Sequence, residues 1–136
     1  MHSAIRSALC AMRFAVKEDN MPDEFFPEEI LALPEADVTF PDVRGRLLQG
    51  PAQQLVFFEI DAEGEVDPHA HGAQWGVVLD GRMELTIGEE TLQYSRGDTY
   101  YIPAGEVHSA RFEARTRVID YFAEPRRYGI KSTPSK

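Results

Sequence analysis

The sequence has only one cysteine, Cys10, among its 136 residues. A single cysteine cannot form a disulfide within the chain, and this scarcity fits a reducing compartment. Long hydrophobic runs are missing as well, since no window approaches the roughly 18 uninterrupted apolar residues of a membrane helix. Arg13 interrupts the apolar residues near the start and no clean small-residue cleavage site follows, so we predict no secretion signal. These absences predict a cytoplasmic protein without a membrane partner.

Basic residues are scarce relative to acidic ones. The 14 lysines and arginines stand against 23 aspartates and glutamates, which gives a formal net charge of −9 at pH 7. Because an acidic body repels a phosphate backbone, we expect no nucleic-acid partner. Hydrophobic residues make up 43% of the chain and aromatic residues 10%, a composition typical of a folded globular protein. The length predicts a single domain.

Short extended segments dominate the chain from about residue 38 onward. Met83, Leu85 and Ile87 alternate with polar residues, which is the period of a half-buried strand. The Asp80-Gly81 pair before them is typical of a hairpin turn. Further extended runs, separated by turn residues, cover residues 54–60, 75–79, 91–94, 99–102, 107–112 and 116–122. This spacing, without alternating helices, predicts an all-β protein built as an antiparallel sandwich or small barrel.

The N-terminal part shows a different pattern. Apolar residues recur at helical spacing over residues 5–16, which indicates either a short amphipathic helix or a frayed terminus. Prolines punctuate the next stretch, and Pro27 is placed to start one or two helical turns. We therefore expect an N-terminal extension over residues 1–37, a β-barrel over residues 38–125 and a C-terminal tail over residues 126–136.

Three histidines are candidate metal ligands. His69 and His71 are two residues apart, and such residues point to the same face of a strand, so their imidazoles would converge. Gln74 follows with a side-chain carbonyl oxygen, and His108 lies on a later predicted strand. Three imidazoles with open coordination positions suit Zn²⁺, Fe²⁺, Ni²⁺, Mn²⁺ or Co²⁺. Spacing alone leaves open the alternative that His69 and His71 are surface residues.

Two segments resemble the two sequence motifs of the cupin superfamily. Residues 64–81 follow the first motif, in which a glycine, His-x-His, a glutamate and a final glycine recur at set spacings. Residues 97–112 follow the second motif, Gly-x5-Pro-x-Gly-x2-His-x3-Asn, with both glycines, the proline and the histidine in place. The resemblance implies a double-stranded β-helix, which is a barrel of two antiparallel sheets. It also implies a small, single-domain, metal-binding protein that pairs as a homodimer.

The sequence departs from these motifs at two positions and in one spacer, since the first spacer of the first motif is one residue short. Gln74 stands where the first motif has glutamate, and Phe112 stands where the second ends in asparagine. The resemblance implies His69, His71, Gln74 and His108 as ligands of a divalent metal. A glutamine in place of glutamate raises the charge of the site by about one unit, which favours an anionic substrate or a bound hydroxide. A cupin that has lost its metal is the alternative.

Aromatic residues near the motifs are candidates for the rest of a site. Trp75 and Phe112 are candidate substrate-binding residues beside the metal, and Tyr101 and Tyr121 are candidate catalytic proton donors. Packing in the barrel core is the alternative for each of them. Gln74 cannot act as a general acid or base, and the sequence singles out no other titratable residue for that task.

The resemblance and the neutral ligand set together predict a metal-dependent enzyme. Its substrate would be a small polar metabolite with a carboxylate or carbonyl group, which the metal would polarise. Isomerase, ring-opening, lyase and dioxygenase reactions all fit this description. The alternative is a non-catalytic module that binds a metal or a small ligand, and the missing general acid or base leaves this alternative open.

Overall fold

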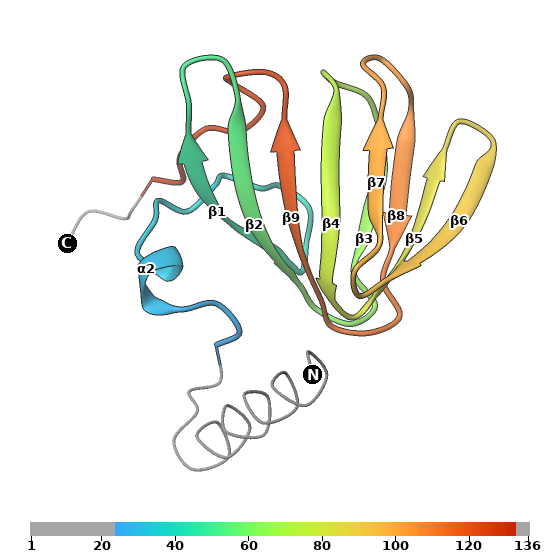
Figure 1. The fold of residues 1–136 in the computed structure, drawn as a ribbon, viewed down its shortest axis with the longest axis horizontal. Coiled ribbons are helices and arrows are strands. Elements are labelled where there is room, and N and C mark those ends of the chain that lie inside the picture. Colours follow the sequence, from blue (N-terminus) through green and yellow to red (C-terminus); the bar gives the residue numbers. More distant parts are fainter. Residues whose placement is uncertain (1–23, 133–136) are drawn as a thin grey trace, which may run out of the picture.

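The computed structural model describes residues 24–132, which fold into two antiparallel sheets (Figure 1). One sheet has the strand order β1-β2-β9-β4-β7, and the other has the order β3-β8-β5-β6. The strands are β1 (Val43–Gln49), β2 (Gln54–Ile60), β3 (Glu65–His69), β4 (Gln74–Asp80), β5 (Arg82–Ile87), β6 (Glu90–Ser95), β7 (Thr99–Ile102), β8 (His108–Arg111) and β9 (Thr116–Phe122). The all-β class and the two antiparallel sheets predicted from the sequence are confirmed.

Glycines turn the chain between strands where the sequence predicts turns. Gly81, between β4 and β5, and Gly97, between β6 and β7, both have a φ of +91°. This left-handed conformation is one that residues with a Cβ rarely adopt. A Cβ at Gly81 would also collide with the backbone carbonyl of Arg115. The hairpin between β4 and β5 therefore needs glycine for both conformation and space.

The hydrophobic core lies between the two sheets. Every second side chain of β2 is buried, and on β5 Met83 and Leu85 are buried while Arg82 is exposed. Each of these strands turns one face to the core and the other away from it, because successive side chains of a strand point in opposite directions. The core includes Leu47, Val56, Phe58, Ile60, Val78, Met83, Leu85, Ile102, Val118 and Phe122.

The segment before β1 packs against the five-stranded sheet. Its single helical turn, α2 (Glu28–Leu31), begins directly after the proline that the sequence marks as a helix start. Phe26 is buried, and its ring lies edge-on to that of Phe57 on β2 with 5.7 Å between the centroids. Ala36 is also buried and forms an isolated β-bridge with Ile130. This N-terminal segment and the chain after β9 therefore contact one another.

The predicted C-terminal tail begins with residues that pack on the barrel. The Gln54 amide donates a hydrogen bond to the Tyr128 carbonyl at 2.8 Å, and the Tyr128 N–H donates one to Gln54 Oε1 at 3.0 Å. These two bonds hold the Tyr128 backbone against β2. The amphipathic helix expected over residues 5–16 lies outside the described residues. Within residues 24–132, no helix has the length and apolar character needed to cross a membrane.

Candidate metal centre

Three imidazole rings meet inside the barrel. His69 ends β3, His71 lies in the following loop, and His108 begins β8. The ring centroids are 4.3 Å apart for His69 and His108, 4.8 Å for His71 and His108, and 5.1 Å for His69 and His71. Each ring offers a nitrogen, and these nitrogens all lie within 4.8 Å of one another. The cluster can therefore hold a divalent metal ion.

The other ring nitrogen of each histidine is bonded to the backbone. Every Nδ1 lies 2.8 to 2.9 Å from a nearby carbonyl oxygen: that of Asp67 for His69, of Gly72 for His71 and of Glu106 for His108. A carbonyl oxygen only accepts hydrogen bonds, so each neutral ring carries its proton on Nδ1 and keeps a lone pair on Nε2. Backbone bonds of this kind also fix the orientation of imidazole ligands. All three rings thus have the tautomer that binds a metal through Nε2.

Burial keeps these imidazoles neutral at pH 7. It is the largest cause that lowers the pKa of all three histidines below the usual 6.5, and for His71 the pKa falls to about 4. The positive charge of Arg127 acts in the same direction on each ring. Because a metal binds only the deprotonated imidazole, lowered pKa values favour binding over protonation.

The strand that carries His69 is shorter than predicted. The sequence places His69 and His71 on one strand face, whereas β3 ends at His69 and His71 lies in a loop. The pairing of β3 with β8 is irregular between Val66 and His69, a stretch that contains Pro68, which has no N–H to donate. Pairing resumes with His69 directly opposite His108, so the ladder itself brings these two rings together.

The loop that carries His71 is held in place by a residue that follows β9. The Gly72 N–H donates a hydrogen bond of 2.6 Å to the carboxylate of Glu124, which follows β9. The same carboxylate oxygen lies 3.5 Å from His71 Nδ1. A Cβ on Gly72 would lie only 2.7 Å from that oxygen, so a larger residue there would displace the Glu124 carboxylate. Tertiary contacts of this loop, and not strand alternation, therefore place His71.

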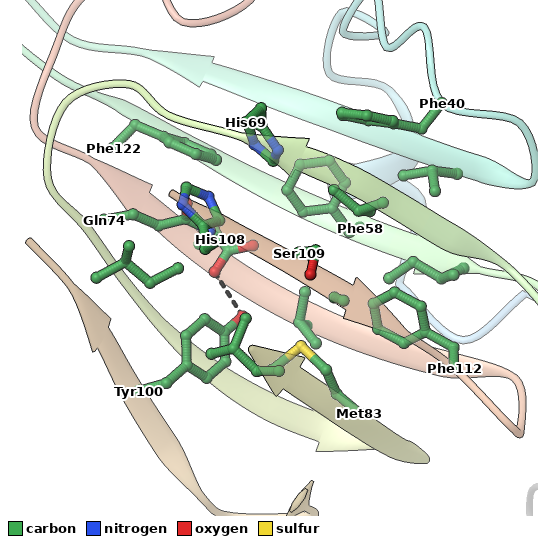
Figure 2. A pocket seen from close by; sticks show the side chains of 18 of the residues that line it. Phe40, Phe58, His69, Gln74, Met83, Tyr100, His108, Ser109, Phe112 and Phe122 are labelled. Atoms are coloured by element: carbon green, nitrogen blue, oxygen red, sulfur yellow. Dashed lines mark hydrogen bonds between the residues drawn. The ribbon is translucent and has the colours of Figure 1, made fainter. Parts of the chain in front are cut away.

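Gln74 places a further oxygen atom in this part of the barrel. It begins β4 and is 8% exposed, and Figure 2 shows it beside the imidazole of His108. Its Oε1 and the Nε2 of His71 are both buried, and neither has a hydrogen-bond partner among residues 24–132. Buried polar atoms are nearly always satisfied, so two free acceptors at one place fit a cation that both would bind. Three imidazole nitrogens and one amide oxygen would form a neutral donor set suited to first-row divalent metals.

The histidines line an otherwise mostly apolar cavity. Its volume is about 60 Å³, which is room for an ion and a few water-sized groups. Side chains from both sheets contribute to its wall, as Figure 2 shows for Met83, Phe58 and Phe112. The His71 ring also lies edge-on to Phe122, with 5.5 Å between the centroids. A small molecule in this cavity would meet the imidazoles in surroundings that hold little water.

A buried acid lines the same cavity. Asp120 on β9 is 4% exposed and accepts a 2.6 Å hydrogen bond from the hydroxyl of Tyr100 on β7 (Figure 2). Burial raises the pKa of Asp120 to about 6, while hydrogen bonds from Tyr100 and Gln74 act in the opposite direction. The sequence analysis does not single out either residue. The alternation of buried residues along β9 could have indicated that Asp120 points inward, because it lies two residues from Val118 and two from Phe122, which are both buried.

An arginine lies close to the three histidines. Arg127 lines a depression together with Phe40, His69 and Tyr128, all three of which also line the cavity. Its guanidinium carbon lies 4.3 Å from the centre of the Tyr128 ring, and its Nε is buried with no hydrogen-bond partner in the described part of the chain. A positive charge therefore lies beside His69, and Asp37 lines the same depression. No pattern in the sequence indicated that Arg127 would lie beside His69.

The aromatic residues proposed from the sequence fall on two faces. Phe112 is 4% exposed and lines the cavity, as expected of a residue that contacts a ligand. Trp75, Tyr101 and Tyr121 are 44%, 58% and 39% exposed and do not belong to the cavity lining. Each of the three directly follows an inward-pointing residue on its strand, so alternation turns it outward. Contact with a substrate, predicted for Trp75, and proton donation, predicted for Tyr101 and Tyr121, would require side chains that reach the cavity. These three side chains lie outside it.

Comparison with known families agrees with the fold and the site. Residues 55–122 match the family model described as cupin domain, and both sequence motifs lie within this range. The chain therefore belongs to the cupin family.

Particular relatives share parts of the chain. An uncharacterised protein of Streptomyces coelicolor is 39% identical over 59 residues, which are 43% of this chain and 55% of that protein. Quercetin 2,3-dioxygenase of Bacillus subtilis is 46% identical over 46 residues, 33% of this chain and only 14% of the dioxygenase. Among solved structures, KdgF from Halomonas sp. is similar over 78% of this chain and 96% of its own, with 26% identity and a TM-score of 0.62. The chain thus spans about half, or far less, of the curated relatives it matches.

Proposed function

We propose that this protein is a metal-dependent enzyme that acts on a small anionic metabolite with a carboxylate or carbonyl group. The observation that carries the proposal is the convergence of three imidazoles, each with Nδ1 bonded to a backbone carbonyl, on the wall of a mostly apolar cavity. Such backbone bonds are typical of metal-ligating histidines. A surface or core histidine has no need of two neighbours with the same tautomer and a free Nε2.

His69, His71 and His108 would hold the metal, with Gln74 Oε1 as a fourth ligand. The bound divalent ion would supply Lewis acidity toward a carbonyl or carboxylate oxygen. The residues of this chain keep the imidazole tautomers fixed and surround the site with apolar side chains, which exclude water and strengthen electrostatic interactions. The proposal includes Zn²⁺, Fe²⁺, Ni²⁺, Mn²⁺ and Co²⁺, because nitrogen-rich sites bind all of these ions.

Two features support an anionic substrate. The donor set is neutral, so no ligand in direct contact would cancel the charge of a divalent ion, and Arg127 adds a further positive charge beside His69. A substrate carboxylate would be attracted to both charges. The similarity to a dioxygenase over a short segment supports an enzyme over a non-catalytic module. The proposal includes isomerase, ring-opening, lyase and dioxygenase reactions, and the identity of the metal would decide among them.

Metal analysis of the purified protein tests this proposal. We expect one transition metal per chain after expression in supplemented medium, and turnover of at least one member of a panel of sugar acids and keto acids. His108→Ala should weaken metal binding by more than about 100-fold, beyond the usual effect of removing a residue that only supports a ligand. His2→Ala is the matched control, because His2 is the one histidine outside the two sequence motifs.

Unchanged metal binding in His108→Ala, or a wild-type protein without metal, would contradict the metal site. A protein that binds metal and is stabilised by a panel member without converting any of them would support the non-catalytic module instead.

We also propose that the protein is a cytoplasmic homodimer. The single cysteine supports the compartment. The outer face of the five-stranded sheet supports the dimer, since a cross-strand row of apolar side chains runs over it and exposed patches of this kind mark interaction surfaces. This outer row consists of Leu48, Leu55, Tyr121, Trp75 and Tyr101.

A further inference from the structure

We propose that Asp120 and Tyr100 are positioning residues that direct the side-chain oxygen of Gln74 toward the three histidines. In addition, the Asp120 carboxylate places behind Gln74 the negative charge that a glutamate ligand would have carried. The inference rests on the proposed function, because it takes Gln74 as a ligand of the metal.

The first support is a buried polar group. The Tyr100 hydroxyl donates to Asp120 Oδ1 at 2.6 Å, and the Gln74 side chain lies close enough to the same carboxylate to lower its pKa. All three residues line the cavity, and each is at most 8% exposed. Charged groups that are buried this deeply are stable only when neighbours satisfy them. The hydroxyl and the amide are the neighbours that do so here.

The second support comes from the two ends of an amide. An ionised carboxylate only accepts hydrogen bonds, so it selects the NH₂ end of Gln74 and leaves Oε1 on the opposite side. Oε1 is indeed the end that is buried without a partner in the described chain. Without such a selector an amide can present either end, because oxygen and nitrogen have nearly the same shape. Asp120 therefore decides which end of Gln74 faces the imidazoles.

The third support is the space that one glycine leaves on β4. Gly76 lies opposite Tyr100 on one neighbouring strand and opposite Asp120 on the other. A Cβ at Gly76 would collide with Asp120 Oδ1 and with the Tyr100 hydroxyl. The pair can meet across β4 only because this residue has no side chain. Gln74 lies two residues earlier on β4, on the same face, and so reaches the same carboxylate.

The charge of the Asp120 carboxylate affects how strongly the site would bind a metal. A cation bound by three neutral imidazoles and an amide has no anion in direct contact with it. The Asp120 carboxylate beside Gln74 would polarise the amide and make its oxygen a stronger donor to a metal. Groups that support metal ligands in this way commonly change metal affinity by about 10 to 100-fold.

Metal affinity is the measurement that tests this inference. Competition with a chromophoric chelator, with Zn²⁺ and with Ni²⁺ as probes, should show about 10 to 100-fold weaker binding in Asp120→Asn. Tyr100→Phe removes one of two donors to a carboxylate that remains, so we expect a smaller loss. Tyr101→Phe is the matched control, because it makes the same change one residue further on, on the outer face, and should bind as the wild type does.

A reciprocal exchange separates positioning from general damage to the fold. Gln74→Glu alone puts two carboxylates in contact and should weaken metal binding at pH 7 or require uptake of a proton. The double variant Gln74→Glu/Asp120→Asn exchanges the carboxylate and the amide with no change in side-chain length. It restores an amide-to-carboxylate hydrogen bond, with the charge now on the metal side, and should recover affinity to wild-type level or above. If the two side chains did not act on one another, the two changes would be additive.

The outcomes distinguish this inference from the proposed function. Loss of binding in His108→Ala together with unchanged affinity in Asp120→Asn would overturn the positioning role alone. Additive losses in the double variant would also overturn it. Unchanged binding in His108→Ala would instead overturn the metal site itself.

Discussion

The two faces of the five-stranded sheet carry opposite chemistry, although the same strands build both. The inner face of β4, β7 and β9 includes three buried polar side chains within the apolar core, while the outer face presents aromatic rings. The inward and outward residues are sequence neighbours: Gln74 and Trp75, Tyr100 and Tyr101, Asp120 and Tyr121. Buried polar groups and exposed aromatic rings reverse the usual distribution. A reversal of this kind marks the places where a sheet is used for binding rather than for packing.

The largest expected contrast in stability lies between two adjacent residues of β9. Phe122 is 1% exposed and its neighbour Tyr121 is 39% exposed. Phe122→Ala should lower the free energy of unfolding by about 3 to 5 kcal/mol, the usual cost of removing a buried phenylalanine ring. Tyr121→Ala should cost less than about 1 kcal/mol, since surface substitutions have small effects. Denaturant unfolding of both variants measures the difference, and similar losses would contradict the assignment of the two faces.

Burial should also change the pKa of the histidines that line the cavity. In metal-free protein we expect His71 to titrate with a pKa of about 4, because burial disfavours the charged ring. The folded pKa then lies below the unfolded one, so the unfolded state binds more protons between pH 4 and pH 6.5. The His71 contribution to stability is therefore lost as the pH falls through this window.

Nitrogen NMR of the imidazoles checks this expectation directly. At pH 7 the three clustered histidines should be neutral with the proton on Nδ1, as their backbone bonds require. Following the rings themselves avoids interference from Asp120, whose raised pKa gives stability the opposite pH dependence. A pKa near 6.5 for His71, or protons on Nε2, would show that the rings are not held as described.

The smallest expected effect concerns the outer face and association of two chains. Trp75→Glu puts a charge within the outer row and should weaken the dimer by about tenfold or more, as loss of an aromatic anchor commonly does. Leu92→Glu on β6 is the matched control, because Leu92 is similarly exposed, at 49% against 44% for Trp75, but lies on the other sheet. Sedimentation equilibrium measures both. Equal weakening by the two variants, or a monomeric wild type, would contradict this interface.

Much of the fold was predictable because strands and turns are local. Alternation over residues 83–87 and the Asp80-Gly81 turn are properties of adjacent residues, and the structure has a strand and a hairpin at these places. The candidate ligands were also visible, since the two motifs contain the clustered histidines and Gln74. The phase of each strand was harder to predict. A shift of one residue separates Tyr100 from Tyr101 and exchanges the inner face for the outer.

The sequence by itself determined the strands, the turns and the residue types that could bind a metal, because these depend on spacing along the chain. Only the tertiary structure decided which of two neighbouring aromatic residues faces the cavity, and that a loop brings His71 to the other imidazoles. It also brought together Asp120, Tyr100 and Arg127 with the candidate site. Such groups come from distant parts of the sequence, and their meeting depends on strand pairing and on the space that Gly76 leaves.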